Sequence, residues 1–388
     1  MHIAITGIGL NSGLGDGVPA HQRAIDAGQH QLRPLADLLG NDSPFASISA
    51  SWIEDRSVML SRKWAPASAL SLHVARQAIE DAGLTDSDLT NTAVLVGSSR
   101  GNVAGWLSPW PGRRPFKLMA ASNSMHGELA SAVSIELGTH GPWQVISSGC
   151  AASLDALGMA RMMMLAGMAK RAIVIGVELP LLPEVLQAYA HTGVLATHSG
   201  NDPYAPDASG FFPGEAAAAL VLENTEEENS HPTLTGYWCN SDAASPIGMP
   251  EDGGSLARCL SQALGDLNEL KDQPPIAAIC PHASGTLLHG KAELAAMRSQ
   301  LNTDQPLSLH PLKPFTGHTV GASGVLDCAI LSQYMRQGSL PPNLPGLTDP
   351  AGGFTLDPAN PVGKTILKIA VGMGGHNSIV SLRCPNSP

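Results

Sequence analysis

Short apolar runs alternate along the chain with longer runs that are rich in alanine. The short runs have the length and β-branched content of buried strands, and we expect strands at Ile3–Ile8, Ala93–Gly97, Ala172–Val177, Ala216–Leu222, Ala277–Cys280, Lys368–Gly372 and Ser378–Arg383. The longer runs predict helices at Ala65–Ala82, Ser124–Leu137, Ala151–Ala166, Leu256–Leu267, Lys291–Gln300 and Gly324–Gln337. Strands that alternate with helices of this length predict an α/β fold with largely buried sheets.

An acidic, polar segment that ends in a proline, Glu223–Pro232, is the best internal boundary. A strand precedes it, and the same order of strands and helices begins again after it. We therefore expect two related halves, residues 1–225 and 232–388, that share one core. This expectation rests on the order of elements, because no repeat is visible at the level of individual residues.

Composition limits the possible partners. Of the 388 residues 43% are hydrophobic and only 14% are charged, so most of the chain must be packed. The net charge of −11 argues against nucleic acid or an anionic membrane as the main partner. The chain has no basic leader and no apolar run of roughly 20 residues, from which we expect a cytoplasmic protein. The six cysteines show no C-x-x-C spacing, so we expect no metal.

The segment "VISSGCAASLDALGMA" contains the best candidate nucleophile, Cys150. A β-rich run, Val145–Ser147, leads through small residues to this cysteine, and a helix is expected to follow. A cysteine in the first turn of a helix lies at the positive end of the helix dipole, which favours the thiolate. The alternative is a buried structural cysteine at a strand–helix turn.

Two histidines lie in loops suited to a site. His282 in "PHASGT" follows an apolar strand, and His318 in "LKPFTGHTVGASG" comes five residues after Lys313. Ser284 and Thr286 alternate with His282 and could bond the amides of a ligand. Either histidine alone could equally be structural. Together, two neutral imidazoles facing a thiolate can polarise a thioester carbonyl and stabilise an enolate.

These motifs together resemble the elongating β-ketoacyl-(acyl carrier protein) synthases of the thiolase superfamily. The resemblance rests on segments that occur in the family's order over nearly the whole chain: "AITGIGLNSGLGDG", "SSGCAAS", "FFPGEAAAALVLE", "HASGT", "KPFTGH", "GSLPPNLP" and "GMGGHNS". It implies a five-layer αβαβα fold of two related halves. It also implies a dimer, formed with a second copy or with a ketosynthase paralogue.

The resemblance further implies decarboxylative Claisen condensation without a cofactor, on substrates carried by the phosphopantetheine of an acyl carrier protein. Cys150 would hold the acyl chain, and His282 and His318 would bind malonyl-carrier protein with support from Lys313. Further implied roles are an oxyanion hole formed by the backbone N–H groups of Cys150 and Met373, substrate contacts from Ser284, Thr286 and Met373, and structural roles near the site for Glu215, Gly374, Gly375 and Asn377.

The sequence departs from the family pattern near its end. Met373 replaces a common gating phenylalanine, His376 replaces a threonine, and Gly290 replaces an acidic residue. These changes suggest a specialised ketosynthase, similar to stand-alone enzymes of type II polyketide or aryl polyene-type pathways. A second reading is a non-catalytic partner that resembles a chain-length factor. A thiolase is the third, although its second catalytic cysteine is missing from "GMGGHNS".

An acidic carrier protein requires a local basic site on this acidic chain. Candidate side chains stand out in a first half with few charges; they are Arg56, Arg62, Lys63, Arg113 and Arg114. A solvated group of charges is the alternative for each of them.

Overall fold

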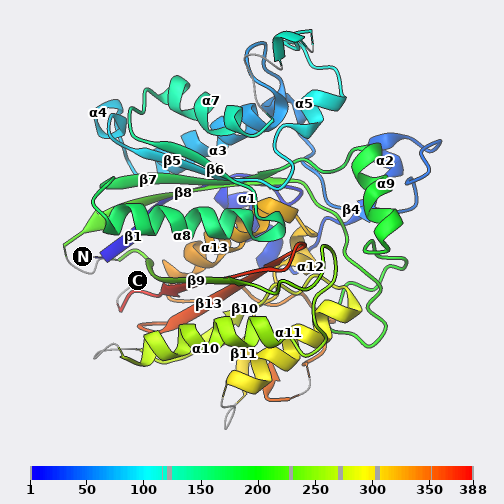
Figure 1. Ribbon diagram of the computed structural model, residues 1–388, viewed down its shortest axis with the longest axis vertical. Helices are drawn as coiled ribbons and strands as arrows, with labels where there is room; N and C mark the ends of the chain where they lie inside the picture. Colours follow the sequence, from blue (N-terminus) through cyan, green and yellow to red (C-terminus); the bar gives the residue numbers. More distant parts are fainter. Residues whose placement is uncertain are drawn as a thin grey trace.

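The computed structural model describes residues 2–115, 117–119, 125–226, 230–269, 274–301, 306–350 and 352–386. Helices and sheets alternate in five layers (Figure 1). Helices α3 (Pro66–Asp81) and α7 (Gly127–Leu137) cover one sheet, and α10 (Gly254–Glu269) and α11 (Leu287–Gln300) cover the other. Between the sheets lie α8 (Ala152–Leu165) and α13 (Ser323–Met335). The five-layer α/β architecture expected from the sequence is confirmed.

The two halves repeat one sheet topology. The strands of the first half are β1 (His2–Ser12), β5 (Ala93–Gly97), β6 (Trp143–Ile146), β7 (Arg171–Glu178) and β8 (Ala216–Thr225), in the spatial order β1-β8-β7-β5-β6. Those of the second half are β9 (Thr233–Ser241), β10 (Ile276–Cys280), β11 (Leu307–Leu309), β13 (Thr365–Gly372) and β14 (His376–Arg383), in the matching order β9-β14-β13-β10-β11. Parallel and antiparallel pairings also correspond. One residue pair, Ala4 with Thr233, joins β1 to β9.

Shorter elements connect these strands and helices. They are β2 (Gly15–Asp16), α1 (Val18–Asp26), β3 (Arg33–Pro34), α2 (Ala36–Leu39), β4 (Ser49–Ala50), α4 (Asp86–Leu89), α5 (Val103–Leu107), α9 (Pro183–Thr192), α12 (Lys313–Thr316), β12 (Phe354–Thr355) and the 3₁₀ turns Arg56–Met59, Gly149–Ala151 and Val320–Ala322. No helix in the described ranges combines the length and the apolar character that crossing a membrane requires.

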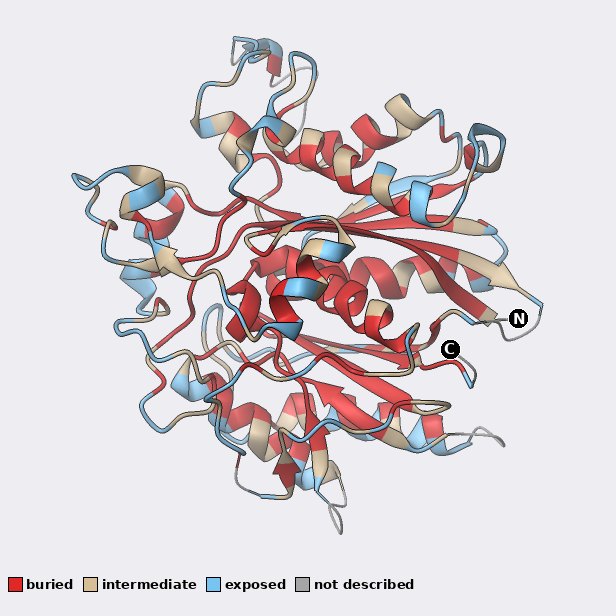
Figure 2. Cartoon of the chain, turned by 180° about the vertical axis from the view of Figure 1, so that it is seen from behind, coloured by how far each residue is buried: buried red, intermediate tan, exposed pale blue. Residues whose placement is uncertain are grey.

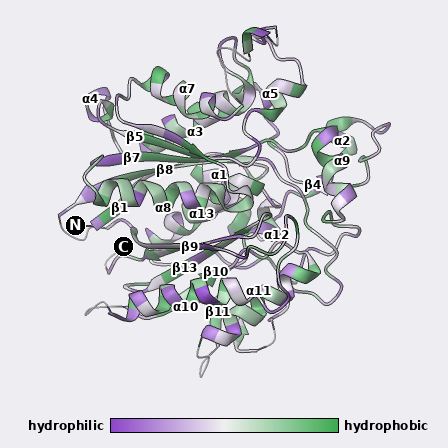
Figure 3. Cartoon of the chain, in the orientation of Figure 1, coloured by the Kyte–Doolittle hydropathy of each residue, from purple (hydrophilic) through white to green (hydrophobic). Residues whose placement is uncertain are grey.

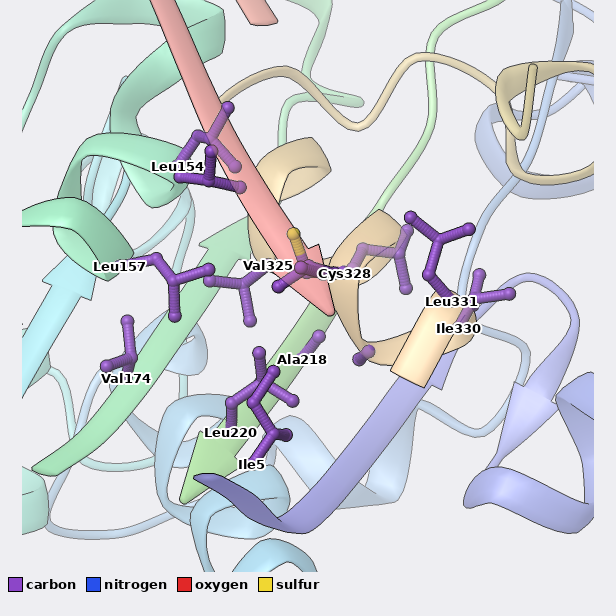
Figure 4. Close-up of a cluster of buried hydrophobic side chains, with 14 of the residues drawn as sticks. Ile5, Leu154, Leu157, Val174, Ala218, Leu220, Val325, Cys328, Ile330 and Leu331 are labelled. Atoms are coloured by element: carbon purple, nitrogen blue, oxygen red, sulfur yellow. The ribbon is translucent and has the colours of Figure 1, made fainter. Parts of the chain in front are cut away.

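The central helices have apolar residues on most of their surface because a sheet packs on each side of them. Leu154 and Leu157 of α8 and Val325 and Cys328 of α13 belong to one buried cluster with residues of β1, β7 and β8 (Figure 4). Small residues allow this approach, since a Cβ on Gly324 would lie 2.4 Å from the backbone nitrogen of Leu154. Burial and apolar character are greatest in the sheets and this central layer, whereas polar residues occupy the outer helices and loops (Figures 2 and 3).

The predicted strands and helices are all present, with shifted ends. Of the expected helix Ser124–Leu137, Ser124 lies outside the described residues and α7 begins at Gly127. Helix α11 begins at Leu287, four residues before the expected Lys291, so part of the presumed loop after His282 is helical. Strands β9 and β11 and helices α1 and α9 were not predicted. The longer of the two strands is β9. Its "TLTGYWCNS" interrupts apolar positions with glycine, polar and exposed residues, which weakens the strand pattern.

Candidate active site

Two backbone segments meet around Cys150. The cysteine lies in the 3₁₀ turn Gly149–Ala151, which leads directly into α8, and it is only 4% exposed. The end of β13 packs against this turn so closely that a Cβ on its last residue, Gly372, would lie 2.5 Å from the carbonyl oxygen of Ser148. This contact requires glycine at position 372 and brings Met373 next to the nucleophile.

The electrostatic environment of Cys150 differs from the expectation of a favoured thiolate. Burial raises the pKa of the thiol to about 11, although the charge of Lys313 and a backbone hydrogen bond from Met373 oppose the shift. Desolvation of a fully buried thiolate therefore outweighs the charge and the hydrogen bond that favour it. Cys150 is a neutral thiol at physiological pH, and a base or a substrate must assist its deprotonation.

His282 and His318 face each other across the site. His282 follows the end of β10, where its backbone N–H donates to Oε1 of Glu293 at 2.6 Å. The N–H of His318, just after α12, donates to the carbonyl of Phe212 at 2.6 Å. The two ring centroids lie 5.2 Å apart with the rings nearly perpendicular, at 87°. Two segments that are distant in sequence thus bring both imidazoles to one place.

Both imidazoles are neutral near pH 7. Burial, followed by the charge of Lys313, holds the pKa of His282 and of His318 well below the ordinary value. Lys313 begins α12, and its Nζ donates to the carbonyl oxygen of His282. Burial lowers the pKa of Lys313 to about 8, and the charge of Lys368 adds to the shift. The expected neutral histidines beside a lysine are therefore present.

A cavity of about 350 Å³ connects Cys150 with His282 and His318. Its lining contains seven of the residues singled out from the sequence, but not Lys313; the seven are Cys150, His282, Ser284, Thr286, His318, Met373 and Gly375. The hydroxyls of Ser284 and Thr286 lie 3.1 Å apart. Apolar side chains of the lining that remain partly exposed, Ile247, Leu287 and Leu288, mark the side that opens to solvent. A slender thioester arm could reach Cys150 and both histidines through this opening.

Glu215 and Asn377, for which structural roles near the site were expected, each bind another segment of the chain. Oε2 of the buried Glu215 lies 2.6 Å from Nη1 of Arg56 and accepts a longer hydrogen bond, of 3.4 Å, from the Ile53 N–H. Nδ2 of Asn377 donates to Oδ1 of Asp242 at 2.7 Å, just beyond the glycine loop. In that loop Gly374 has a φ of 96°, which favours glycine.

The model for the β-ketoacyl synthase N-terminal domain matches residues 1–228, and the model for the C-terminal domain matches residues 231–346. The chain belongs to the β-ketoacyl synthase family. It is a ketosynthase, and hence an acyltransferase of fatty acid or type II polyketide chain elongation.

Curated relatives match the ketosynthase over nearly its full length. The ketoacyl synthase alpha subunit of the tetracenomycin polyketide synthase from Streptomyces glaucescens is 26% identical, over 99% of this chain and 97% of the relative. The 3-oxoacyl-[acyl-carrier-protein] synthase 2 of Rhizobium meliloti (strain 1021) is also 26% identical, over 98% of each chain.

Solved structures share the fold. One is a type II polyketide ketosynthase in complex with its acyl-carrier protein, with a TM-score of 0.81, 22% identity and 99% coverage of both chains. Another is the ishigamide ketosynthase/chain length factor, with a TM-score of 0.82, 22% identity and 98% coverage of both chains.

The basic residues proposed for carrier binding differ in their surroundings. Arg56 is paired with the buried Glu215, and Nζ of Lys63 lies 2.6 Å from Oε1 of Glu136. Arg62, Arg113 and Arg114 are exposed, and none of the five basic residues lines the cavity of the ketosynthase. The backbone of Arg62 lies next to Gly112, which places Arg62 and Arg113 in one surface region.

Several groups near the site of the ketosynthase were not identified from the sequence. His289 lines the cavity with its ring centroid 4.7 Å from that of His282. The sequence offered a signal for it, because His289 ends the eight-residue segment "HASGTLLH" that His282 begins. Lys368 is buried beneath the site in the middle of β13, where a charged residue inside an apolar strand could also have been noted. Among the residues that the structure describes, no cluster of His, Cys, Asp or Glu side chains is arranged to hold a metal ion.

Proposed function

We propose that this ketosynthase performs decarboxylative Claisen condensation with an acyl chain held on Cys150. The observation that carries the proposal is the single cavity into which Cys150, His282 and His318 all open. A condensing enzyme needs a nucleophile and a site for an enolate within reach of one another.

In the first half-reaction, the Cys150 sulfur attacks the acyl thioester of a carrier protein. A bond forms between this sulfur and the acyl carbon, the bond to the pantetheine sulfur breaks, and the thiol proton passes to the departing pantetheine thiolate. Backbone N–H groups of Cys150 and Met373 would stabilise the tetrahedral oxyanion. The high pKa of the free thiol agrees with attack that is coupled to proton transfer.

In the second half-reaction, a malonyl thioester lies with its carbonyl oxygen between His282 and His318. Cleavage of the bond to the carboxylate releases carbon dioxide and leaves its electron pair in an enolate, which the two imidazoles stabilise by hydrogen bonds. The enolate carbon then attacks the acyl carbon on Cys150. The thiolate that leaves takes up one proton, so the products are a β-ketoacyl thioester, carbon dioxide and the free Cys150 thiol.

The two rival functions lack support at particular positions. A partner of the chain-length-factor type would not require the nucleophile, and Cys150 is retained inside the cavity. A thiolase would need a second cysteine in the glycine loop. Cys384 lies instead beyond β14, buried and within 3.4 Å of the Met335 carbonyl oxygen.

Intact-protein mass spectrometry tests the proposed chemistry directly. Incubation with a panel of acyl-carrier proteins should add the mass of one acyl group, and Cys150→Ala should abolish that addition. His282→Ala and His318→Ala should reduce condensation much more than acylation. His310→Ala is the matched control, because His310 is buried but does not line the cavity. Elongation of acyl chains by the Cys150→Ala variant, with no other ketosynthase present, would refute the proposed function.

An acyl carrier protein is the proposed partner that delivers both substrates, and Arg62 and Lys63 are candidate contacts. Charge reversal at either residue should raise the KM for the carrier protein more than it changes kcat. Lys170→Glu is a suitable control, because this exposed lysine precedes β7 at the end away from the cavity. An unchanged KM for both variants would exclude this region.

The proposed second partner is another ketosynthase-fold chain, either a copy or a paralogue. Strand β6 ends the sheet order in the first half, and it leaves Trp143 45% exposed. Ile135 on the neighbouring α7 is 61% exposed. An open strand edge beside exposed apolar side chains suits pairing with another strand. Sedimentation of the wild type and of Trp143→Lys tests this surface.

A further inference from the structure

A lysine lies within strand β13 without contact with solvent. Lys368 is fully buried, and its Nζ lies 2.5 Å from Oδ2 of Asp327, which is also buried, on α13. Burial of two charges costs several kcal/mol per ion, and an apolar replacement of such a pair is often neutral or even stabilising. The pair is therefore poorly explained by stability, and its other contacts suggest a different role.

Lys368 and Lys313 bind consecutive carbonyl groups at the end of β10. Nζ of Lys368 donates to the carbonyl of Pro281 at 3.1 Å, and Nζ of Lys313 donates to the carbonyl of His282. The N–H groups of the same two peptide units, those of His282 and Ala283, donate to Glu293 at 2.6 and 2.9 Å. Both peptide groups that flank the His282 side chain are thus held on their donor and acceptor sides.

Charged and titratable groups from several elements surround Lys313. They are Cys280 of β10, His282 in the loop after β10, His289 and Glu293 of α11, His318 after α12, Asp327 of α13, Lys368 of β13 and Cys150 before α8. Glu293 already accepts hydrogen bonds from two backbone N–H groups and from the Tyr204 hydroxyl. Asp327 is paired with Lys368. Lys313 therefore has no carboxylate of its own among the described residues.

We propose that Lys368 and Asp327 are positioning residues of the condensing site. Lys368 holds the peptide group before His282 in place. The opposite charges of Lys368 and Asp327 together determine whether Lys313 stays protonated and so continues to donate to the carbonyl of His282. This role rests on the proposed function, since it acts through His282 on the malonyl thioester. The low pKa of Lys313, to which Lys368 contributes, agrees with it.

The test is the pH profile of malonyl-carrier protein decarboxylation, measured in a Cys150→Gln background so that no thiol titrates at position 150. The alkaline limb of this profile reports loss of the proton from Lys313. Lys368→Met leaves Asp327 free to attract Lys313, so this limb should move to higher pH, by roughly one unit. Asp327→Asn leaves Lys368 unpaired beside Lys313, so the same limb should move to lower pH by a similar amount. A residue that only stabilised the fold would not give shifts of opposite sign.

The double variant Lys368→Met/Asp327→Leu removes both charges. It tests the same proposal if the single variants do not fold. Its alkaline limb should lie between those of the single variants, and its kcat should fall roughly tenfold or more with KM changed less than twofold, because His282 is held less firmly. A wild-type kcat in the double variant, or single-variant limbs that coincide or move together, would overturn the inference. Absence of decarboxylation in Cys150→Gln itself would instead contradict the proposed function.

Discussion

Nε2 of His376 lies 2.8 Å from Oδ2 of Asp155. This ion pair links the first residue of β14, just after the glycine loop that contains Met373, to the helix that follows Cys150. The same carboxylate accepts hydrogen bonds from the hydroxyls of Ser148 and, at 3.0 Å, Tyr237. The segment around Cys150 and the loop that contains Met373, which are proposed to form the oxyanion hole, are thus both bound to Asp155 through neighbouring residues.

The pair makes stability depend on pH. Asp155 raises the pKa of His376 above its ordinary value of 6.5. Folding therefore favours the protonated ring, and this stabilisation is complete below about pH 6.5 and is lost as the pH rises through the folded-state pKa. The His376 side chain is 30% exposed, so solvent screening limits the effect to roughly 0.5 kcal/mol.

Thermal unfolding of the wild type and of His376→Gln at pH 5.5 and pH 8.5 measures this contribution. Glutamine can still donate to Asp155 but does not titrate. The wild type should gain melting temperature relative to the variant at pH 5.5 only. An equal difference at both pH values would show that the histidine does not act through its charge.

The reactivity of Cys150 should increase steeply with pH. Because burial raises the pKa of this thiol to about 11, the thiolate fraction and hence the rate of alkylation by iodoacetamide should rise about tenfold per pH unit between pH 7 and pH 9. Peptide mapping separates Cys150 from Cys239, the exposed cysteine of the chain. A rate that reaches its plateau by pH 8 would mean that the thiolate is stabilised after all.

Gly372→Ala should damage both stability and activity. Its Cβ would lie 2.5 Å from the carbonyl oxygen of Ser148, and the overpacked loop must move at a cost of about 1–3 kcal/mol. Acylation of Cys150 should fall because Met373 moves with the loop. The control is Gly265→Ala at an exposed position of helix α10, where a Cβ meets nothing within 4 Å, and this change should stabilise the protein by about 0.5–1 kcal/mol.

Arg56 and Arg62 should respond differently to loss of charge. Arg56→Met leaves the carboxylate of Glu215 buried without its partner, so the free energy of unfolding should fall by about 1–3 kcal/mol. Arg62→Met removes an exposed charge and should leave stability within about 0.5 kcal/mol of the wild type. Thermal unfolding distinguishes the two, and equal melting temperatures would mean that water replaces Arg56 without loss.

The order of strands and helices was accessible from the sequence because both sheets are buried on their two faces. Such sheets produce continuous apolar runs, as in Ala216–Leu222, and the central helices produce alanine-rich ones. Strand β9 was not predicted, since its position between two antiparallel strands depends on partners far along the chain. The start of α11 was misplaced because Leu287 and Leu288 are exposed apolar residues that resemble a loop.

The candidate site was predictable where short motifs carry chemistry, and less so where long-range contacts determine it. Cys150, His282 and His318 stand in motifs with fixed spacing, and the cavity unites them. The contact between Lys368 and Asp327 joins residues 41 positions apart, so only the packing of α13 on β13 reveals it. The sign of the Cys150 pKa shift was also inaccessible, because it depends on how completely the turn is buried.

Division of the site between the two halves has a consequence for biosynthesis. Cys150 and α8 are translated before His282, His318 and α13. In the folded chain, however, Leu154 and Leu157 of α8 are covered in part by α13 (Figure 4). The nascent first half therefore leaves the ribosome with an apolar helix face that has no cover. Until α13 emerges, this face exposes the chain to aggregation and to chaperones. The yield of active ketosynthase should then depend on chaperone supply during synthesis as well as on the stability of the finished chain.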